Sequence, residues 1–361
     1  MPTTADYLND LVTQKDSLAK TLSDNGVEVG ENETFSTLVP KANEKIASGV
    51  DVVAARVDGT EIKYINNNIE TIPAYAFQGC SGLTKVECQN VVSCDGMYTF
   101  AGCESLTSIS LPNMTTLGSS SSEAICTFSG CISLEVVSMP NLESITERTN
   151  FGYMFKNCSS LRIANFLKLK RVPYRMFDNC YALEEIYMPE ATAASNWAFA
   201  HCTVPMLSLP KMETFGADNT FTNSGIQIIE LPSILLIKNN KTFLNCKQLH
   251  TLTLGTSRDS TLEMYIDTTT FQGCTSLQSL TVNCTLKRYG GTNLSLTACP
   301  LTLESAKSVI ESLYNYSGTS EDLAYSLSFS TFTLGLLEAE GATAPGDITW
   351  IDYANRKGWN I

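Results

Sequence analysis

A short motif, Phe-x-x-Cys-x-x-Leu, recurs through the middle of this 361-residue chain and constrains its fold more than any other feature. Full copies begin at Phe77, Phe100, Phe128, Phe155, Phe177, Phe243 and Phe271. Two further copies, at Phe199 and Phe221, lack one residue before the apolar position. Successive phenylalanines are 22 to 28 residues apart, which is typical of proteins in which every repeat forms one supersecondary unit.

Each motif continues into a short segment in which apolar residues alternate with others and which often ends in proline. One example has Ile186 and Met188 on one side of Tyr187, followed by Pro189. This alternation is typical of a strand with one buried face, and proline ends it because proline has no N–H to donate. A single short strand per repeat can only pair with its counterpart in the next repeat. The pattern therefore predicts a repeat β-solenoid with a parallel sheet, of about nine to ten coils over residues 49–299.

The phenylalanine and cysteine positions of the motif predict two columns inside the solenoid. The predicted structural ladder of small apolar thiols contains Cys80, Cys103, Cys131, Cys158, Cys180, Cys202, Cys246 and Cys274. Ser224 replaces the cysteine in the remaining copy, and the parallel thiols of a ladder would not converge on a metal ion. We therefore predict a core role instead of a metal or redox role. The role of the five cysteines outside the ladder stays unassigned: Cys88, Cys94, Cys126, Cys284 and Cys299.

The pattern Ala-Phe-x-x-Cys-x-x-Leu-x-x-Ile-x-Leu-Pro resembles the BspA-like leucine-rich repeats of gut and oral bacteria, over roughly residues 55 to 300. The resemblance implies a solenoid of leucine-rich-repeat type, with short turns or helical segments between the strands. It also implies a surface protein, because members of this family are mostly cell-surface adhesins or uncharacterised proteins.

The first 48 residues differ from the repeats and predict a small helical hairpin. Leu8, Leu11, Leu18 and Leu22 follow helical spacing, and Gly26 ends that segment. A hairpin of this size buries too little surface to stand alone; it is either a cap on the solenoid or an attachment module that makes the protein a homo-oligomer. Its sequence resembles N-terminal modules of phage tail and other minor structural proteins, which implies a virion protein assembled in the host cytoplasm.

Residues 300–361 predict an α/β cap at the other end. Thr302 can cap a helix that contains Ala306, Val309 and Ile310. Residues 323–329 alternate as a strand, and a last helix around Trp350 ends at Gly358. We expect this helix–strand–helix segment to cover the open edge of the solenoid sheet.

Catalytic, metal and cofactor sites are not predicted, and we expect no enzyme. His201 and His250 are the two histidines of the chain, and no nucleotide-binding, hydrolase or metalloprotease motif accompanies them. Glu184 and Glu185 are adjacent, and strand alternation would point them to opposite faces. The net charge of −13 disfavours nucleic-acid and anionic-membrane partners.

Two sets of side chains are candidates for binding a protein or glycan. The predicted patch on the outer sheet face contains Val136, Ile163, Tyr187, Met206 and Ile228. The predicted aromatic row, two residues before the phenylalanines, contains Tyr75, Tyr98, Tyr153 and Trp197. Strand propensity is the alternative explanation for the patch, and turn packing for the row.

Three functional classes remain open at this point, and the weakest of them is an enzyme, which would need convergent acidic residues in a deep cleft. The first is a phage tail-associated protein that recognises a host surface through its solenoid. The second is a bacterial cell-surface adhesin that binds protein or glycan. The sequence shows no apparent signal peptide, which favours the first unless a leader has been removed.

Overall fold

The computed structural model describes residues 56–58, 61–65, 67–118, 125–146, 152–215, 218–238, 241–291, 293–321, 325–341 and 343–361. They belong to two compact units. Unit 1 runs to residue 169 and includes 179–182, whereas unit 2 comprises 170–178 and 183–361. The predicted hairpin, residues 1–48, lies outside the described residues.

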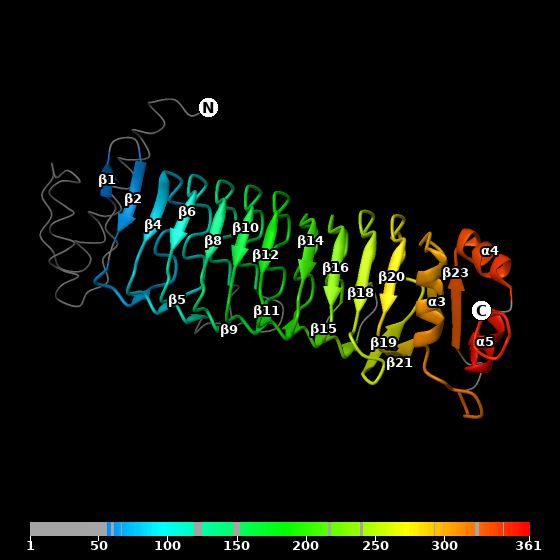
Figure 1. The fold of residues 1–361 in the computed structure, drawn as a ribbon. Helices are drawn as coiled ribbons and strands as arrows, with labels where there is room; N and C mark the ends of the chain where they lie inside the picture. Colours follow the sequence, from blue (N-terminus) through cyan, green and yellow to red (C-terminus); the bar gives the residue numbers. More distant parts are fainter. Residues whose placement is uncertain are drawn as a thin grey trace, which may run out of the picture. The chain divides into compact units, whose positions relative to one another are not determined.

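Unit 1 contains two sheets, and each coil contributes one short strand to each of them (Figure 1). The first sheet contains β1 (Arg56–Asp58), β2 (Glu61–Ile65), β4 (Leu83–Glu87), β6 (Ser108–Ser110), β8 (Val136–Ser138) and β10 (Ile163–Asn165). Its pairs are parallel apart from β1 with β2. The second, parallel sheet contains β3 (Thr71–Ile72), β5 (Ser93–Asp95), β7 (Thr116–Gly118) and β9 (Ser144–Thr146).

Unit 2 repeats this arrangement. One set of strands contains β12 (Glu185–Tyr187), β14 (Met206–Ser208), β16 (Ile228–Leu231), β18 (Thr251–Leu254) and β20 (Ser279–Val282). The other contains β11 (Arg171–Val172), β13 (Ala193–Ala194), β15 (Thr214–Phe215), β17 (Leu236–Ile237), β19 (Thr261–Ile266) and β21 (Thr285–Gly291). Neighbouring strands from β14 to β20 in the first set, and from β11 to β21 in the second, pair in parallel.

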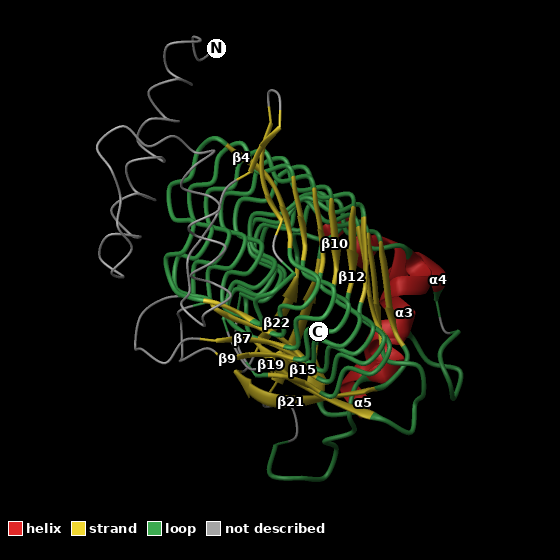
Figure 2. Ribbon diagram, turned by 90° about the vertical axis from the view of Figure 1, so that its left-hand side faces the viewer, coloured by secondary structure: helices red, strands yellow, loops and turns green. Residues whose placement is uncertain are grey.

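The core of each unit follows the repeated motif. In unit 1, the rings of Phe100 and Phe128 stack at 5.2 Å between centroids, nearly parallel at 3°. In unit 2, Phe221 and Phe243 stack at 5.5 Å and 4°. Figure 2 shows the connecting loops of successive coils superposed around this interior. The predicted β-solenoid of leucine-rich-repeat type is confirmed.

A tight turn lies two residues after each phenylalanine of the motif, and it explains which residue types occupy that position. At this position φ lies between 55° and 79° in all nine copies. Its occupants are Gly79, Gly102, Gly130, Asn157, Asn179, His201, Asn223, Asn245 and Gly273. Glycine, asparagine and histidine are the residue types that tolerate the left-handed region best, so the backbone restricts this column to them.

The C-terminal segment contains three helices and a small sheet. The helices are α3 (Leu303–Ser312), α4 (Thr331–Glu340) and α5 (Trp350–Arg356). The parallel sheet contains β22 (Asn293–Leu296), β23 (Tyr325–Phe329) and β24 (Trp359–Asn360). The Thr302 side chain accepts from the backbone N–H of Ser305, so the predicted helix start is confirmed. The sequence reasoning missed α4, in which Thr331, Thr333 and Gly335 have low helix propensity but Ser330 caps the first turn.

Helix α3 covers the last strand of the unit 2 sheet. The Ser305 and Ser308 hydroxyls each accept a hydrogen bond at 3.0 Å, from the backbone N–H groups of Leu280 and Val282 respectively. These are donors that an open sheet edge would leave unpaired. With at most 10 residues each, α3, α4 and α5 are too short to cross a membrane, and no other described helix could do so.

Candidate functional site

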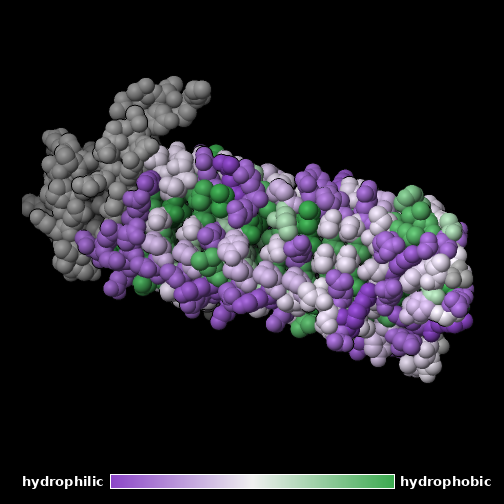
Figure 3. All heavy atoms as spheres, viewed as in Figure 1, coloured by the Kyte–Doolittle hydropathy of each residue, from purple (hydrophilic) through white to green (hydrophobic). Residues whose placement is uncertain are grey.

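The outer faces of the strands carry the predicted patch, with unequal exposure. Val136 is 40% exposed, Tyr187 50% and Met206 46%, while Ile163 and Ile228 are half-buried. Val136 pairs in register with Ile163 in unit 1, and Met206 with Ile228 in unit 2. Figure 3 shows apolar groups (green) among polar ones (purple) on the face that bears these strands. The structure thus leaves outward apolar pairs accessible in each unit.

In unit 2 the patch borders a concavity of about 470 Å³. Its lining consists of Glu184, Glu185, Ile186, Tyr187, Pro189, Met206, Ser208 and Pro210. The expectation that Glu184 and Glu185 point to opposite faces was wrong. Glu184 precedes β12, so strand alternation does not apply to it. Both glutamates are exposed and both line the concavity.

The concavity lies where the strand ladder of this face is interrupted. β12 and β14 belong to different hydrogen-bonded sheets, although both lie in unit 2 and contact each other. On the other face of the same coils, β11, β13 and β15 pair without interruption. Pro205, directly before β14, has no backbone N–H to donate. This coil is also one of the two whose motif lacks a residue, so the local sequence accounts for the interruption.

Carboxylates dominate the charge of this region. Neither lysine, arginine nor histidine is among the residues that line the concavity. Lys211, next to Pro210, donates to both carboxylate oxygens of Glu190 at 2.6 and 2.7 Å. Glu230, on β16, is in register with Ser208. Acidic side chains therefore outnumber basic ones among these residues.

The aromatic row occupies another turn position of the coils. Tyr75, Tyr98 and Trp197 have φ values of 60°, 51° and 58°. The Tyr75 and Tyr98 rings stack on each other at 5.9 Å, and the Lys156 ammonium lies 5.1 Å from the centre of the Tyr153 ring. These contacts within the protein support the packing alternative for the row, while its role in binding stays a prediction.

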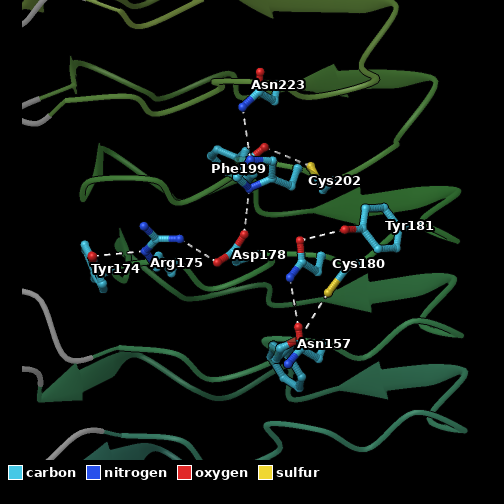
Figure 4. A network of polar contacts seen from close by, with 12 residues as sticks. Asn157, Tyr174, Arg175, Asp178, Cys180, Tyr181, Phe199, Cys202 and Asn223 are labelled. Carbon is cyan, nitrogen blue, oxygen red and sulfur yellow. Dashed lines mark hydrogen bonds and ion pairs between the residues drawn. The ribbon is translucent and has the colours of Figure 1, made fainter. Parts of the chain in front are cut away.

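A polar network that the sequence reasoning did not predict surrounds Trp197. Asp178 is 2% exposed, and its two carboxylate oxygens contact Arg175 Nη1 at 2.7 Å and His201 Nδ1 at 2.8 Å. The Arg175 guanidinium lies 4.4 Å from the Trp197 ring centre. Figure 4 shows Arg175 between Tyr174 and Asp178. Every charged group in this network has a partner, as a stabilising cluster requires.

Two residues that differ from those at the same positions of other copies could have indicated this network. Asp178 follows the motif phenylalanine, where other copies carry Gln78, Ala101 or Thr222. His201 replaces glycine or asparagine in the left-handed turn column. Its Nε2 lies 3.1 Å from Asn223 Nδ2, so the ring joins two neighbouring coils. His201 is therefore engaged in a structural contact.

The structure places the cysteine column inside the coils. Seven of its eight thiols are buried, and Cys80 is half-buried. Each thiol donates to a phenylalanine carbonyl wherever such a bond is resolved, as Cys131 does to Phe100 O at 3.1 Å. Burial raises the pKa of Cys131 and Cys158 well above the ordinary thiol value. These thiols are therefore protonated and enclosed, which is unfavourable for nucleophilic or metal-binding chemistry.

The five cysteines outside the column are also buried, and none of them forms a disulfide bond: Cys88, Cys94, Cys126, Cys284 and Cys299. Burial is the main reason why the pKa of Cys94 rises to about 12 and that of Cys284 to about 11. Across the described ranges, no group of three or more His, Cys, Asp or Glu side chains is arranged to hold a metal ion.

The repeat geometry agrees with comparisons to known proteins. The family model for the BspA type leucine rich repeat region, in six copies, matches residues 59–184 and 170–295. No curated protein matches the sequence. A leucine-rich cell surface protein from Faecalibacterium prausnitzii A2-165 matches with 17% identity and a TM-score of 0.38, over 80% of this chain and 98% of its own. A leucine-rich repeat protein from Bacteroides ovatus ATCC 8483 matches with 16% identity and a TM-score of 0.32, over 78% of this chain and 88% of its own. The family model spans well over half of the sequence and coincides with the coils, so the chain belongs to the family of BspA type leucine-rich-repeat proteins.

Proposed function

We propose that this protein is a non-catalytic binding protein that recognises a protein or glycan on a bacterial or host surface through the outer face of its strands. The supporting observation is the exposed pair Tyr187 and Met206 beside the concavity of unit 2. In unit 1, Val136 and Ile163 form a separate outward apolar pair of the same kind.

Exposure of these side chains is consistent with a partner. The corresponding strand positions of β18 and β20 carry Thr251 and Ser279, so the coil geometry itself does not require apolar residues there. Tyrosine and methionine are enriched at the centres of protein interfaces. In alanine scans, the few residues that dominate an interface each cost about 2 kcal/mol or more of binding free energy when truncated.

The place where the protein acts is a separate part of the proposal. A bacterial cell surface follows from the family's usual setting, and a virion from the resemblance of residues 1–48 to phage tail modules. Light scattering on the full chain and on a chain that starts near Val50 would separate them. A full-length trimer or hexamer that becomes monomeric on truncation favours the virion, and two monomers favour the cell surface.

The binding proposal is tested with arrays of surface glycans and peptides. We expect at least one ligand class whose retention is lost in Met206→Asp, because a charge would enter the apolar part of the surface. Phe332→Asp is the matched control, since Phe332 is an exposed apolar residue on α4 and not on a strand of the outer face. Retention of every ligand by the Met206→Asp protein would contradict the proposed surface.

A further inference from the structure

We propose that the last two strands of the second sheet of unit 2 carry a separate binding site for a neutral oligosaccharide. Three tyrosines form its platform: Tyr265 on β19, Tyr289 on β21 and Tyr314 just after the end of α3. Figure 2 shows β19 and β21 in another layer of the coils than β12. The inference goes beyond the proposed function, which concerns the surface at β12 and β14.

The tyrosine platform lies on the outer face of this sheet. In β19 the residues on either side of Glu263 are buried, so Glu263 and Tyr265 point outward. The Lys287 ammonium on β21 lies 3.4 Å from a Glu263 carboxylate oxygen and 5.6 Å from the centre of the Tyr314 ring. The backbone N–H of Tyr314 donates to Leu286 O at 2.9 Å. The segment after α3 therefore runs beside β21 and continues the same face.

A β-bulge exposes the middle tyrosine. The register between β19 and β21 shifts, so that Tyr265 pairs with Gly290 and Tyr289 is the extra residue. A β-carbon at Gly290 would lie only 2.7 Å from the Tyr265 ring, so glycine leaves the room that this ring occupies. Bulges reorient side chains at the edges of sheets. Here the bulge places two tyrosines at adjacent positions.

The platform offers both apolar faces and hydrogen-bonding groups. Tyr289 and Tyr314 are 47% and 38% exposed, and Tyr265 is half-buried. In the part of the chain that the structure describes, none of their three hydroxyls takes part in a hydrogen bond, whereas the Tyr316 hydroxyl accepts one from the Arg288 backbone N–H. A phenolic hydroxyl can both donate and accept. A sugar ring has an apolar C–H face and a rim of hydroxyls, so the two surfaces match.

The charges beside the platform favour a neutral ligand. Lys287 pairs with Glu263, and Arg288 Nη2 lies 3.3 Å from Glu321 Oε1. Both cations therefore already have an anionic partner. Complementary charge is what gives an ionic ligand its specificity, and a balanced surface does not supply it. Sugar hydroxyls can hydrogen-bond to such paired groups without separating them.

The spacing of the tyrosines suits a ligand of more than one sugar ring. They lie on three successive chain segments, namely β19, β21 and the segment after α3. Neighbouring segments of a sheet are about 4.8 Å apart, so the outer two segments are separated by about 10 Å. A short oligosaccharide spans this distance, and a single monosaccharide does not.

The test is isothermal titration calorimetry of the full chain with four neutral probes: cellotetraose, chitotetraose, maltotetraose and mannotetraose. We expect at least one of them to bind. Tyr289→Ala should raise its Kd about 5- to 10-fold, because an aromatic contact is lost. Gly290→Ala should weaken the same binding without removing a ring, because its β-carbon would displace the Tyr265 side chain. Tyr181→Ala is the matched control and should leave the Kd unchanged, since Tyr181 is an exposed tyrosine of unit 1.

Three results would overturn the inference. The first is that none of the four sugars binds at millimolar concentration; binding of a decaproline peptide through Tyr289 would then assign the platform to protein recognition. The second is an equal loss of sugar binding in Tyr181→Ala and Tyr289→Ala. The third is sugar binding that Met206→Asp abolishes and Tyr289→Ala leaves intact. That result would place the sugar on the surface at β12 and β14, so the proposed function would stand without a second site.

Discussion

The interior and the outer strand face of unit 2 differ in how much their side chains vary from coil to coil. Inside, Phe199, Phe221 and Phe243 are fully buried and stack at 5.4 and 5.5 Å between ring centres. Outside, the residues at one strand position change from Met206 to Ile228 to Thr251. An inward side chain must fit its copies in both neighbouring coils, whereas an outward one need not. The repeat therefore determines the fold, and the departures from it mark where binding can occur.

The largest effect on stability is expected when one stacked phenylalanine ring is removed from the interior. Phe221→Ala should lower the free energy of unfolding by about 3–5 kcal/mol, because it leaves a cavity between two neighbouring rings. Urea unfolding followed by circular dichroism measures the change. Met206→Ala is the control and should change it by no more than about 0.5 kcal/mol. A loss below about 1 kcal/mol for Phe221→Ala would show that the column is not a packed core.

The C-terminal segment differs from the coils, because a lysine contacts its partly buried backbone beyond the last phenylalanine of the column. The Lys357 ammonium donates to the carbonyl oxygens of Ile310, Glu311 and Leu313 at 3.3, 2.7 and 3.0 Å. It thereby satisfies the C-terminus of α3. Lys357→Met should lower the free energy of unfolding by about 2 kcal/mol, because hydrogen bonds from a charged group are lost. An unchanged urea midpoint would contradict this role.

The buried thiols predict a loss of stability at alkaline pH. Burial raises the pKa of Cys158 well above the ordinary thiol value of 9.0, so the folded protein keeps a proton that the unfolded chain releases. The contribution is complete below pH 9 and is lost as the pH rises further. Each such thiol should lower the free energy of unfolding by about 1.4 kcal/mol per pH unit above 9.

Urea unfolding between pH 8 and 10.5 checks this slope in Cys158→Ala against the unchanged protein. The slope should become shallower by about 1.4 kcal/mol per pH unit. Identical slopes for the protein and for Cys158→Ala would indicate that this thiol ionises in the folded state.

The smallest expected effect on stability is on the outer face. Tyr187→Ala should change the free energy of unfolding by no more than about 0.5 kcal/mol, since half of the side chain is already exposed. The same change should reduce retention of the ligand class that the arrays identify for the outer face. A large loss of stability would instead show that Tyr187 belongs to the core.

Much of the fold could be predicted from the spacing of the motif, because the strand that follows each motif can only pair with its counterpart in the next coil. The second strand of each coil, such as β13 or β15, was not predicted. The restriction at His201 and the asparagines of the turn column could not, since it comes from a backbone φ that side-chain periodicity does not reveal. Helix α4 was missed for a related reason. Its packing, with Leu337 buried, outweighs the poor helix propensity of its own residues.

The candidate site was predictable only in part. Alternation along the strands placed Tyr187 and Met206 outward. The concavity between them depends on the interrupted ladder at Pro205, and on Glu184 lying before the strand and not within it. The pairing of Asp178 with Arg175 and His201 joins two coils, and a single unusual residue per coil does not indicate which neighbour it meets.

The most direct test of the difference between inside and outside is native labelling of the cysteine column with a bulky maleimide, resolved residue by residue by mass spectrometry. Cys80 should react in the folded protein, while Cys103, Cys131, Cys158, Cys180, Cys202, Cys246 and Cys274 should react only after unfolding. Rapid native labelling of most of these seven thiols would contradict an inward-facing column, and with it the assignment of binding to the outer face.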